Sequence, residues 1–203
     1  MPRLLIWALA ALAMLAPVIA AGFSPLLEYR QPIYITAGFA GVIGMALMLL
    51  QPLLAGGVLA PYAQARQVHR WIGIVLVLAV LLHVAGLWIT SPPDVIDVLL
   101  VRSPTPFGIW GLIAMWAVFL AAVFAGLRRR LPLRLWRWGH SVLVTLAVVG
   151  TLLHAVQIDG TMEVVTKWML ALLILAALAV ALYRRRVWAM GIRGRGSSRG
   201  RSA

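Results

Sequence analysis

The sequence contains four histidines, which form two pairs with the same spacing. His69 and His83 are fourteen residues apart, and so are His140 and His154. An imidazole can bind haem iron as an axial ligand, bind other transition metals, or carry protons near neutral pH. The chain has no cysteine, so disulfides, iron–sulfur clusters and thiolate metal sites are excluded. Imidazole therefore remains as a metal ligand in this chain.

The fourteen-residue spacing has a simple meaning on an α-helix. Fourteen residues rise about 21 Å and complete almost four turns, which leaves the two side chains about 40° apart on one face. Each helix would then present one imidazole near each surface of a bilayer. If the two helices run in the same direction, His69 faces His140 at one level and His83 faces His154 at the other. This arrangement predicts two stacked cofactors, each held by one histidine from either helix.

The composition places these histidines in a membrane protein. Hydrophobic residues make up 63% of the 203 residues and charged residues only 11%, with a mean hydropathy of +0.98, which is too apolar for the surface of a soluble domain. The first apolar run follows a basic residue as a signal peptide does, but it is longer, so we expect it to remain as a span. The sequence predicts an all-α integral membrane protein, a six-helix bundle with spans at residues 4–22, 33–50, 71–90, 108–127, 139–157 and 162–183.

The connections between the spans carry the turn-forming residues. Pro52, Gly56, Gly57 and Pro61 predict a loop over residues 51–67 that ends the second span. The segment at 91–107 has proline-rich ends and is expected to be irregular rather than helical throughout. Both histidine pairs fall on odd-numbered spans, the third and the fifth, which must cross the membrane in the same direction.

The distribution of charged residues along the chain indicates the orientation of the protein in the membrane. With the N-terminus in the cytoplasm, fifteen of the 18 basic residues face inward, while three basic residues and all five acids lie on the outer side. We therefore expect both termini to be cytoplasmic, and we expect membrane lipid rather than nucleic acid to be the partner of the +13 net charge. The predicted domains are a six-helix transmembrane domain over residues 1–187 and a disordered Arg/Gly/Ser-rich cytoplasmic tail over residues 188–203.

Glycines on the two histidine spans allow two interpretations. Gly73 and Gly86 lie on or beside the histidine face of the third span, and Gly150 lies between the histidines of the fifth. Their missing side chains would leave room for a flat macrocycle. The alternative is ordinary close packing between helices.

Two equally spaced histidine pairs on parallel spans are what bis-histidine ligation of two haems requires. The alternative is a proton or metal transport path built from the same side chains. Such a path normally also needs acids within the membrane, and here every acid is expected at or beyond the outer boundary.

Arginines and tryptophans crowd the inner ends of the histidine spans. Trp136 and Trp138 suit an interfacial belt, and arginines anchor to anionic headgroups. A second interpretation is that arginines near the inner histidines pair with the carboxylates of a porphyrin, as guanidinium groups do well. The candidates for these propionate partners are Arg66, Arg70, Arg134 and Arg137.

The six spans, with VHRWIGI and LLHVAG on the third and WRWGHSV and LLHAVQ on the fifth, resemble the ferric reductase-like transmembrane domain family. That family includes ferric-chelate reductases, NADPH oxidases and the MsrQ haem subunits of bacteria. The resemblance implies that His69 and His140 ligate the iron of an inner haem b, and that His83 and His154 ligate the iron of an outer haem b. The reductases and oxidases continue into a cytosolic FAD and NAD(P)H portion, whereas this sequence has no strand followed by a Gly-rich nucleotide loop.

The expected function is that of a multi-pass cytochrome b of the bacterial inner membrane, the electron-transfer component of an oxidoreductase without its own flavin or NAD(P)H domain. Two haems b would pass electrons from a cytosolic flavoprotein or a quinone to an acceptor on the outer face, such as a periplasmic protein; FMN and quinone are the further cofactors considered. The alternatives are an MsrQ-type subunit serving a periplasmic methionine sulfoxide reductase, a quinol-linked cytochrome b, and a histidine-lined proton or metal transporter. The complete set of four histidines favours the general family over MsrQ.

Overall fold

The structure, a computed structural model, describes residues 2–185 and is all-helical over that range. The tail predicted at residues 188–203 lies outside the described residues. Six of the helices are long and apolar enough to cross a membrane, which confirms the predicted all-α membrane bundle. The helices are α1 (Pro2–Gly22), α2 (Pro32–Ala55), α3 (Tyr62–Thr90), the short α4 (Pro92–Leu99), α5 (Pro106–Gly126), α6 (Leu133–Val156) and α7 (Val164–Arg185), with 3-10 turns at Pro25–Leu27 and Leu127–Arg129.

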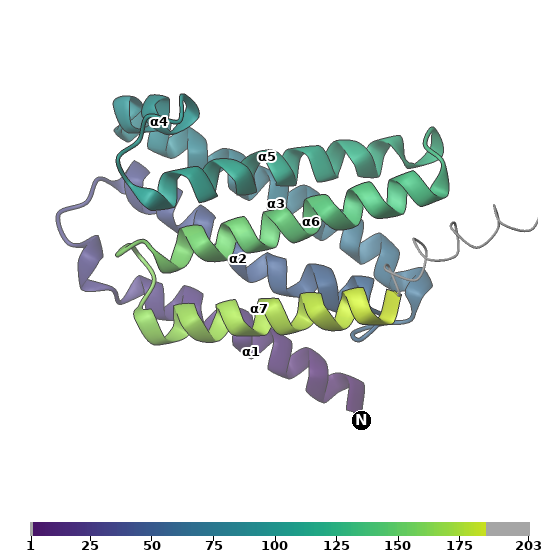
Figure 1. Ribbon diagram of the computed structural model, residues 1–203. Coiled ribbons are helices and arrows are strands. Elements are labelled where there is room, and N and C mark those ends of the chain that lie inside the picture. The colour runs from purple at the N-terminus through teal and green to yellow at the C-terminus, as the bar shows by residue number, and fades with distance from the viewer. Residues whose placement is uncertain (1, 186–203) are drawn as a thin grey trace, which may run out of the picture.

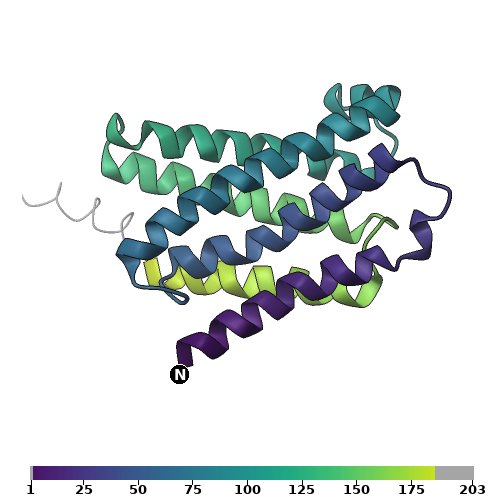
Figure 2. The same cartoon turned by 180° about the vertical axis from the view of Figure 1, so that it is seen from behind.

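The six long helices lie side by side and alternate in direction along the chain (Figure 1). Figure 2 shows from behind that α1 starts and α7 ends at the same end of the bundle. This arginine-rich end carries Arg66, Arg70, Arg128, Arg129, Arg130, Arg134, Arg137, Arg184 and Arg185; the opposite, acidic end carries Glu28, Asp94, Asp97, Asp159 and Glu163. The charges of the described residues thus separate as predicted, while the side that faces the cytoplasm stays a prediction.

The two histidine helices begin earlier than their hydropathy indicates. Helix α3 starts at Tyr62 rather than at residue 71, and α6 starts at Leu133 rather than at residue 139. Hydropathy marks the part of a helix that is immersed in hydrocarbon, and polar helical turns extend beyond it. Consequently His69 and His140 both lie inside continuous helices, and the fourteen-residue spacing is helical throughout in α3 and α6.

Prolines interrupt the chain less than expected. Pro52 lies inside α2, which continues to Ala55, so the loop expected at residues 51–67 shrinks to residues 56–61. The carbonyl of Pro52 still accepts the N–H of Gly56 at 2.8 Å. In the segment at 91–107, Pro92 begins helix α4 instead of preventing it, because the first helical turn needs no N–H donors; the remainder is irregular.

Two helical hairpins, α2–α3 and α5–α6, make the most extensive contacts in the bundle, and α7 packs against α2 and α6. Small residues let α2 approach its neighbours closely: Ala37, Ala40 and Gly44 are all buried. Ile174 and Leu170 of α7 are almost completely buried in the same core. The bundle is therefore built from two closely packed hairpins, and α3 of one faces α6 of the other.

Candidate functional site

The structure brings the four histidines together in two pairs, each with one ring from α3 and one from α6. The ring centroids of His69 and His140 lie 6.5 Å apart, with an angle of 72° between the ring planes. Those of His83 and His154 lie 6.4 Å apart, with an angle of 83°. All four side chains are half-buried. The first pair lies toward the arginine-rich end and the second toward the acidic end.

These distances can be compared with what one shared iron would require. A ligating imidazole nitrogen lies about 2 Å from the metal and about 1.1 Å from its own ring centre, so two rings on opposite sides of an iron would have centres about 6 Å apart. The observed separations of 6.5 and 6.4 Å agree with that value. Both pairs therefore fit a bis-histidine haem iron.

Backbone carbonyls orient three of the four rings. Nδ1 of His83 lies 2.8 Å from the carbonyl oxygen of Ala37, and Nδ1 of His154 lies 2.9 Å from that of Phe107. Nδ1 of His69 lies 3.2 Å from the carbonyl oxygen of Gln51. Because a carbonyl oxygen only accepts, Nδ1 must donate its proton in each case, which leaves Nε2 with a free lone pair. This tautomer is the one that ligates a metal through Nε2.

His140 is held differently. Its Nδ1 is buried and makes no well-formed hydrogen bond with the described residues, although the backbone of Ala121 interacts with the ring. The indole of Trp136 stacks on the imidazole, with centroids 5.6 Å apart and planes at 10°. The guanidinium of Arg128 lies over the indole of Trp136, 5.0 Å from its ring centroid. Trp136 thus faces the site rather than the interfacial belt, whereas Trp138 is 46% exposed.

The arginines predicted as propionate partners differ in their exposure and in their contacts. Arg66, Arg70 and Arg134 are exposed. Arg137 donates from Nη2 to the carbonyl oxygen of Arg185 at 3.2 Å, which links α6 to the last turn of α7. Their role toward a porphyrin carboxylate stays a prediction.

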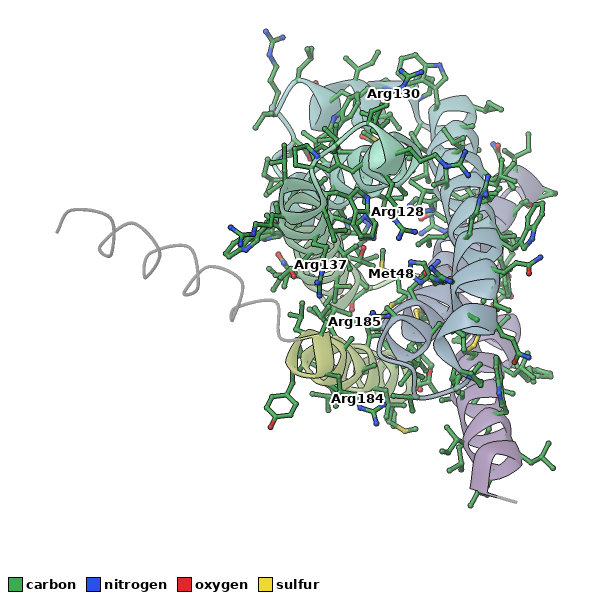
Figure 3. All side chains as sticks on the ribbon, turned by 90° about the vertical axis from the view of Figure 1, so that its right-hand side faces the viewer. Met48, Arg128, Arg130, Arg137, Arg184 and Arg185 are labelled. Atoms are coloured by element: carbon green, nitrogen blue, oxygen red, sulfur yellow. The ribbon has the colours of Figure 1, made fainter. Side chains whose placement is uncertain are left out.

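Two arginines that sequence analysis did not select lie close to the pair at this end. Arg185 donates from Nε to the carbonyl oxygen of Ala55 at 2.6 Å, and its charge acts on His69. Arg128 reaches the His140 side through Trp136. Figure 3 shows Arg128, Arg137 and Arg185 toward the middle of the arginine-rich end and Arg130 at its edge. In sequence Arg128 and Arg185 each belong to a run of three arginines, so no sequence pattern distinguishes them from their neighbours.

The glycines of the histidine helices pack against neighbouring helices. A Cβ at Gly86 would lie 2.7 Å from Cβ of Ala37, and one at Gly150 would lie 3.0 Å from the carbonyl oxygen of Trp110. A Cβ at Gly73 would lie 3.3 Å from Nε2 of Gln51. The interpretation of these glycines as space for a macrocycle is therefore wrong, because each allows close contact within its own hairpin.

An all-helical membrane bundle with two levels of paired imidazoles is typical of membrane electron-transfer components. The family model described as "Ferric reductase like transmembrane component" matches residues 37–151, which run from α2 to the last turns of α6 and include His69, His83 and His140. The chain belongs to this family, which confirms the resemblance seen in the sequence. No curated protein and no solved structure matches the chain.

Proposed function

We propose that this protein is a transmembrane cytochrome b that carries two haems b, one between His69 and His140 and one between His83 and His154. The observation that carries the proposal is the repeated ring separation of 6.5 and 6.4 Å between α3 and α6. When bound, haem supplies a one-electron Fe(III)/Fe(II) couple; the protein contributes the axial ligands, their orientation and the surrounding charge.

The number of protein ligands favours haem over a bare metal ion. Each site supplies two imidazoles, one from α3 and one from α6. A bare zinc or copper ion usually takes about four ligands from its site. The iron of a porphyrin already has four nitrogens from the macrocycle, so two axial histidines complete its coordination.

The two sites are stacked along the bundle. The fourteen-residue separation on α3 and α6 places the two levels about 21 Å apart along the helix axes. In the proposed bacterial inner membrane, a cytosolic flavoprotein or a quinone is the donor at the arginine-rich end, and a ferric complex or periplasmic protein is the acceptor at the acidic end. The apolar helices around the histidines keep water and ions away from this route.

Absorption spectroscopy of the purified protein tests the proposal. We expect a low-spin b-type spectrum with about two haems per chain, because each bis-histidine pair binds one iron. His83→Ala should lose the haem nearer the acidic end and keep the other. A folded, haem-free wild type would contradict the proposal, and ion flux through liposomes containing that haem-free protein would indicate a histidine-lined carrier instead.

A further inference from the structure

In each hairpin, the helix without histidines, α2 or α5, supplies the hydrogen-bond acceptors of its partner's histidines at matching intervals. On α2, the carbonyls of Ala37 and Gln51 are fourteen residues apart, the same interval as His83 and His69, to which they are bonded. The acceptor helix is therefore in register with the histidine helix at both levels of the hairpin.

Helix α5 repeats this arrangement in the second hairpin. The carbonyl of Phe107 accepts from His154. Fourteen residues further along is Ala121, whose backbone interacts with His140 without forming a good hydrogen bond. Carbonyls fourteen residues apart therefore face the two histidines of each hairpin. At the acidic end, both hairpins form a short imidazole–carbonyl hydrogen bond.

A carbonyl inside a helix is difficult for a side chain to reach. It already accepts the N–H of the residue four positions later, and the Cβ of that residue lies beside it. The residue four positions after Ala37 is Gly41, and the residue four positions after Phe107 is Gly111. A Cβ on Gly41 would lie 2.9 Å from Nδ1 and 3.1 Å from Cε1 of His83, and a Cβ on Gly111 would lie 2.7 and 2.8 Å from those atoms of His154.

The arginine-rich end provides an internal comparison. The residues four positions after Gln51 and Ala121 are Ala55 and Ala125, which both carry a Cβ. At this level the Nδ1–oxygen distance is 3.2 Å for His69, and His140 has no well-formed bond. Short imidazole–carbonyl bonds therefore occur where the fourth residue is glycine.

We propose that Gly41 and Gly111 are positioning residues for His83 and His154. Because each lacks a Cβ, the imidazole can lie against the neighbouring helix, so that Nδ1–H reaches the carbonyl four residues earlier. That bond sets the tautomer and directs Nε2 toward the partner ring, 6.4 Å away between centroids. Its effect on haem rests on the proposed function, whereas the effect on the rings themselves does not.

Gly41→Ala and Gly44→Ala form a matched pair for a test in the haem-loaded protein. Both change glycine to alanine on α2, but a Cβ at Gly44 would meet only Leu76 and Ala79, at 3.7 and 3.8 Å, which is ordinary van der Waals contact. We expect Gly41→Ala to weaken binding of one haem about tenfold and to raise its midpoint potential, because an imidazole that has lost this hydrogen bond is a less basic ligand for Fe(III). Gly44→Ala should keep both haems, and equal haem binding and potentials in the two variants would overturn the proposal.

Ring N–H exchange in haem-free protein tests the same proposal without the cofactor. With ¹⁵N-labelled histidine in detergent micelles, the Nδ1–H protons of His83 and His154 should be the most slowly exchanging of the four rings in the wild type. Gly41→Ala should remove the protection of His83 and leave that of His154. If the wild type bound no haem, the proposed function would fail while this measurement remained informative; rapid exchange at His83 and His154 in the wild type would overturn the positioning role, even if the variants did not fold.

Discussion

Carbonyl oxygens orient three of the imidazoles, and an indole face orients the fourth. A hydrogen bond to a carbonyl determines both the ring plane and the tautomer, because the acceptor requires the proton on Nδ1. Stacking determines only the ring plane. His140, stacked on Trp136 with its Nδ1 buried and unbonded among the described residues, is therefore the histidine whose orientation depends most on side-chain packing.

We expect Trp136→Leu to weaken the haem site of His69 and His140 selectively. Aromatic stacking contributes about 0.5–1.5 kcal/mol beyond buried area, which corresponds to at most about a tenfold change in affinity. Haem titration and EPR spectroscopy should show one altered haem signal, with Trp136→Phe restoring most of the wild-type behaviour. Trp138→Leu is the control, since Trp138 is on the same helical turn, is 46% exposed and does not stack on His140; equal effects of the two leucine substitutions would contradict a specific role for the stack.

At the scale of the elements, the last turn of α7 is hydrogen-bonded to the C-terminal end of α2 and to the first turns of α6. Nη1 of Arg184 donates to the carbonyl oxygen of Gly56 at 3.0 Å, and Nε of Arg185 donates to that of Ala55 at 2.6 Å. Basic groups at a helix C-terminus satisfy its free carbonyls and interact favourably with its dipole. The last turn of α7 thus holds the end of α2 beside His69, while Arg137 attaches α6 to the same turn.

The first turn of α7 depends on an acid. Glu163 accepts the N–H groups of Thr166 and Val165 at 2.8 and 2.7 Å, and these bonds lower the pKa of its carboxyl group below the usual 4.5. A lowered pKa means that the capping contribution is present above pH 4.5 and disappears as the pH falls through the lowered value. Glu163→Ala should speed amide hydrogen exchange at Val165 and Thr166 at neutral pH.

The pH dependence of that exchange distinguishes capping from a general loss of stability. Below the lowered pKa, the wild type and Glu163→Ala should have the same protection at these two amides, since the wild-type carboxylate is then protonated. Asp159→Ala at the same end should leave the amides unchanged. A difference that persisted unchanged at low pH would refute the role of the charged cap.

For the whole molecule, the separation of charge between its ends predicts its orientation. All five acids of the chain lie at the acidic end, whereas ten of the twelve arginines of the described residues, including Arg3 at the start of α1, lie at the other. Positively charged segments are retained in the cytoplasm during insertion. A fluorescent protein fused after residue 203 should therefore fluoresce in cells, and alkaline phosphatase fused there should be inactive. Reporters inserted at residues 102–104 should behave in the opposite way, and the reverse pattern would show that the bundle is inverted.

Much of this molecule follows from patterns that are local in the sequence. Long apolar runs determine six membrane helices, because a bilayer requires about 20 apolar residues per span. The equal spacing of His69 with His83 and of His140 with His154 follows the helical repeat, so each helix had to present both imidazoles on one face. Because α3 and α6 are the third and fifth spans, they cross the membrane in the same direction. That was enough to predict which rings would meet.

Tertiary structure decided everything that depends on how the helices are rotated and brought together. Gly41 and Gly111 meet the imidazoles of His83 and His154, whereas Gly73 and Gly86 meet Gln51 and Ala37. Arg128 covers the ring of Trp136, whereas Arg130 of the same arginine run lies at the edge of this end of the bundle. Hydropathy and helical periodicity describe one helix at a time, whereas these contacts join residues far apart in the chain. The sequence by itself therefore determined the two histidine pairs, and only the packing of the hairpins determined how each ring is held.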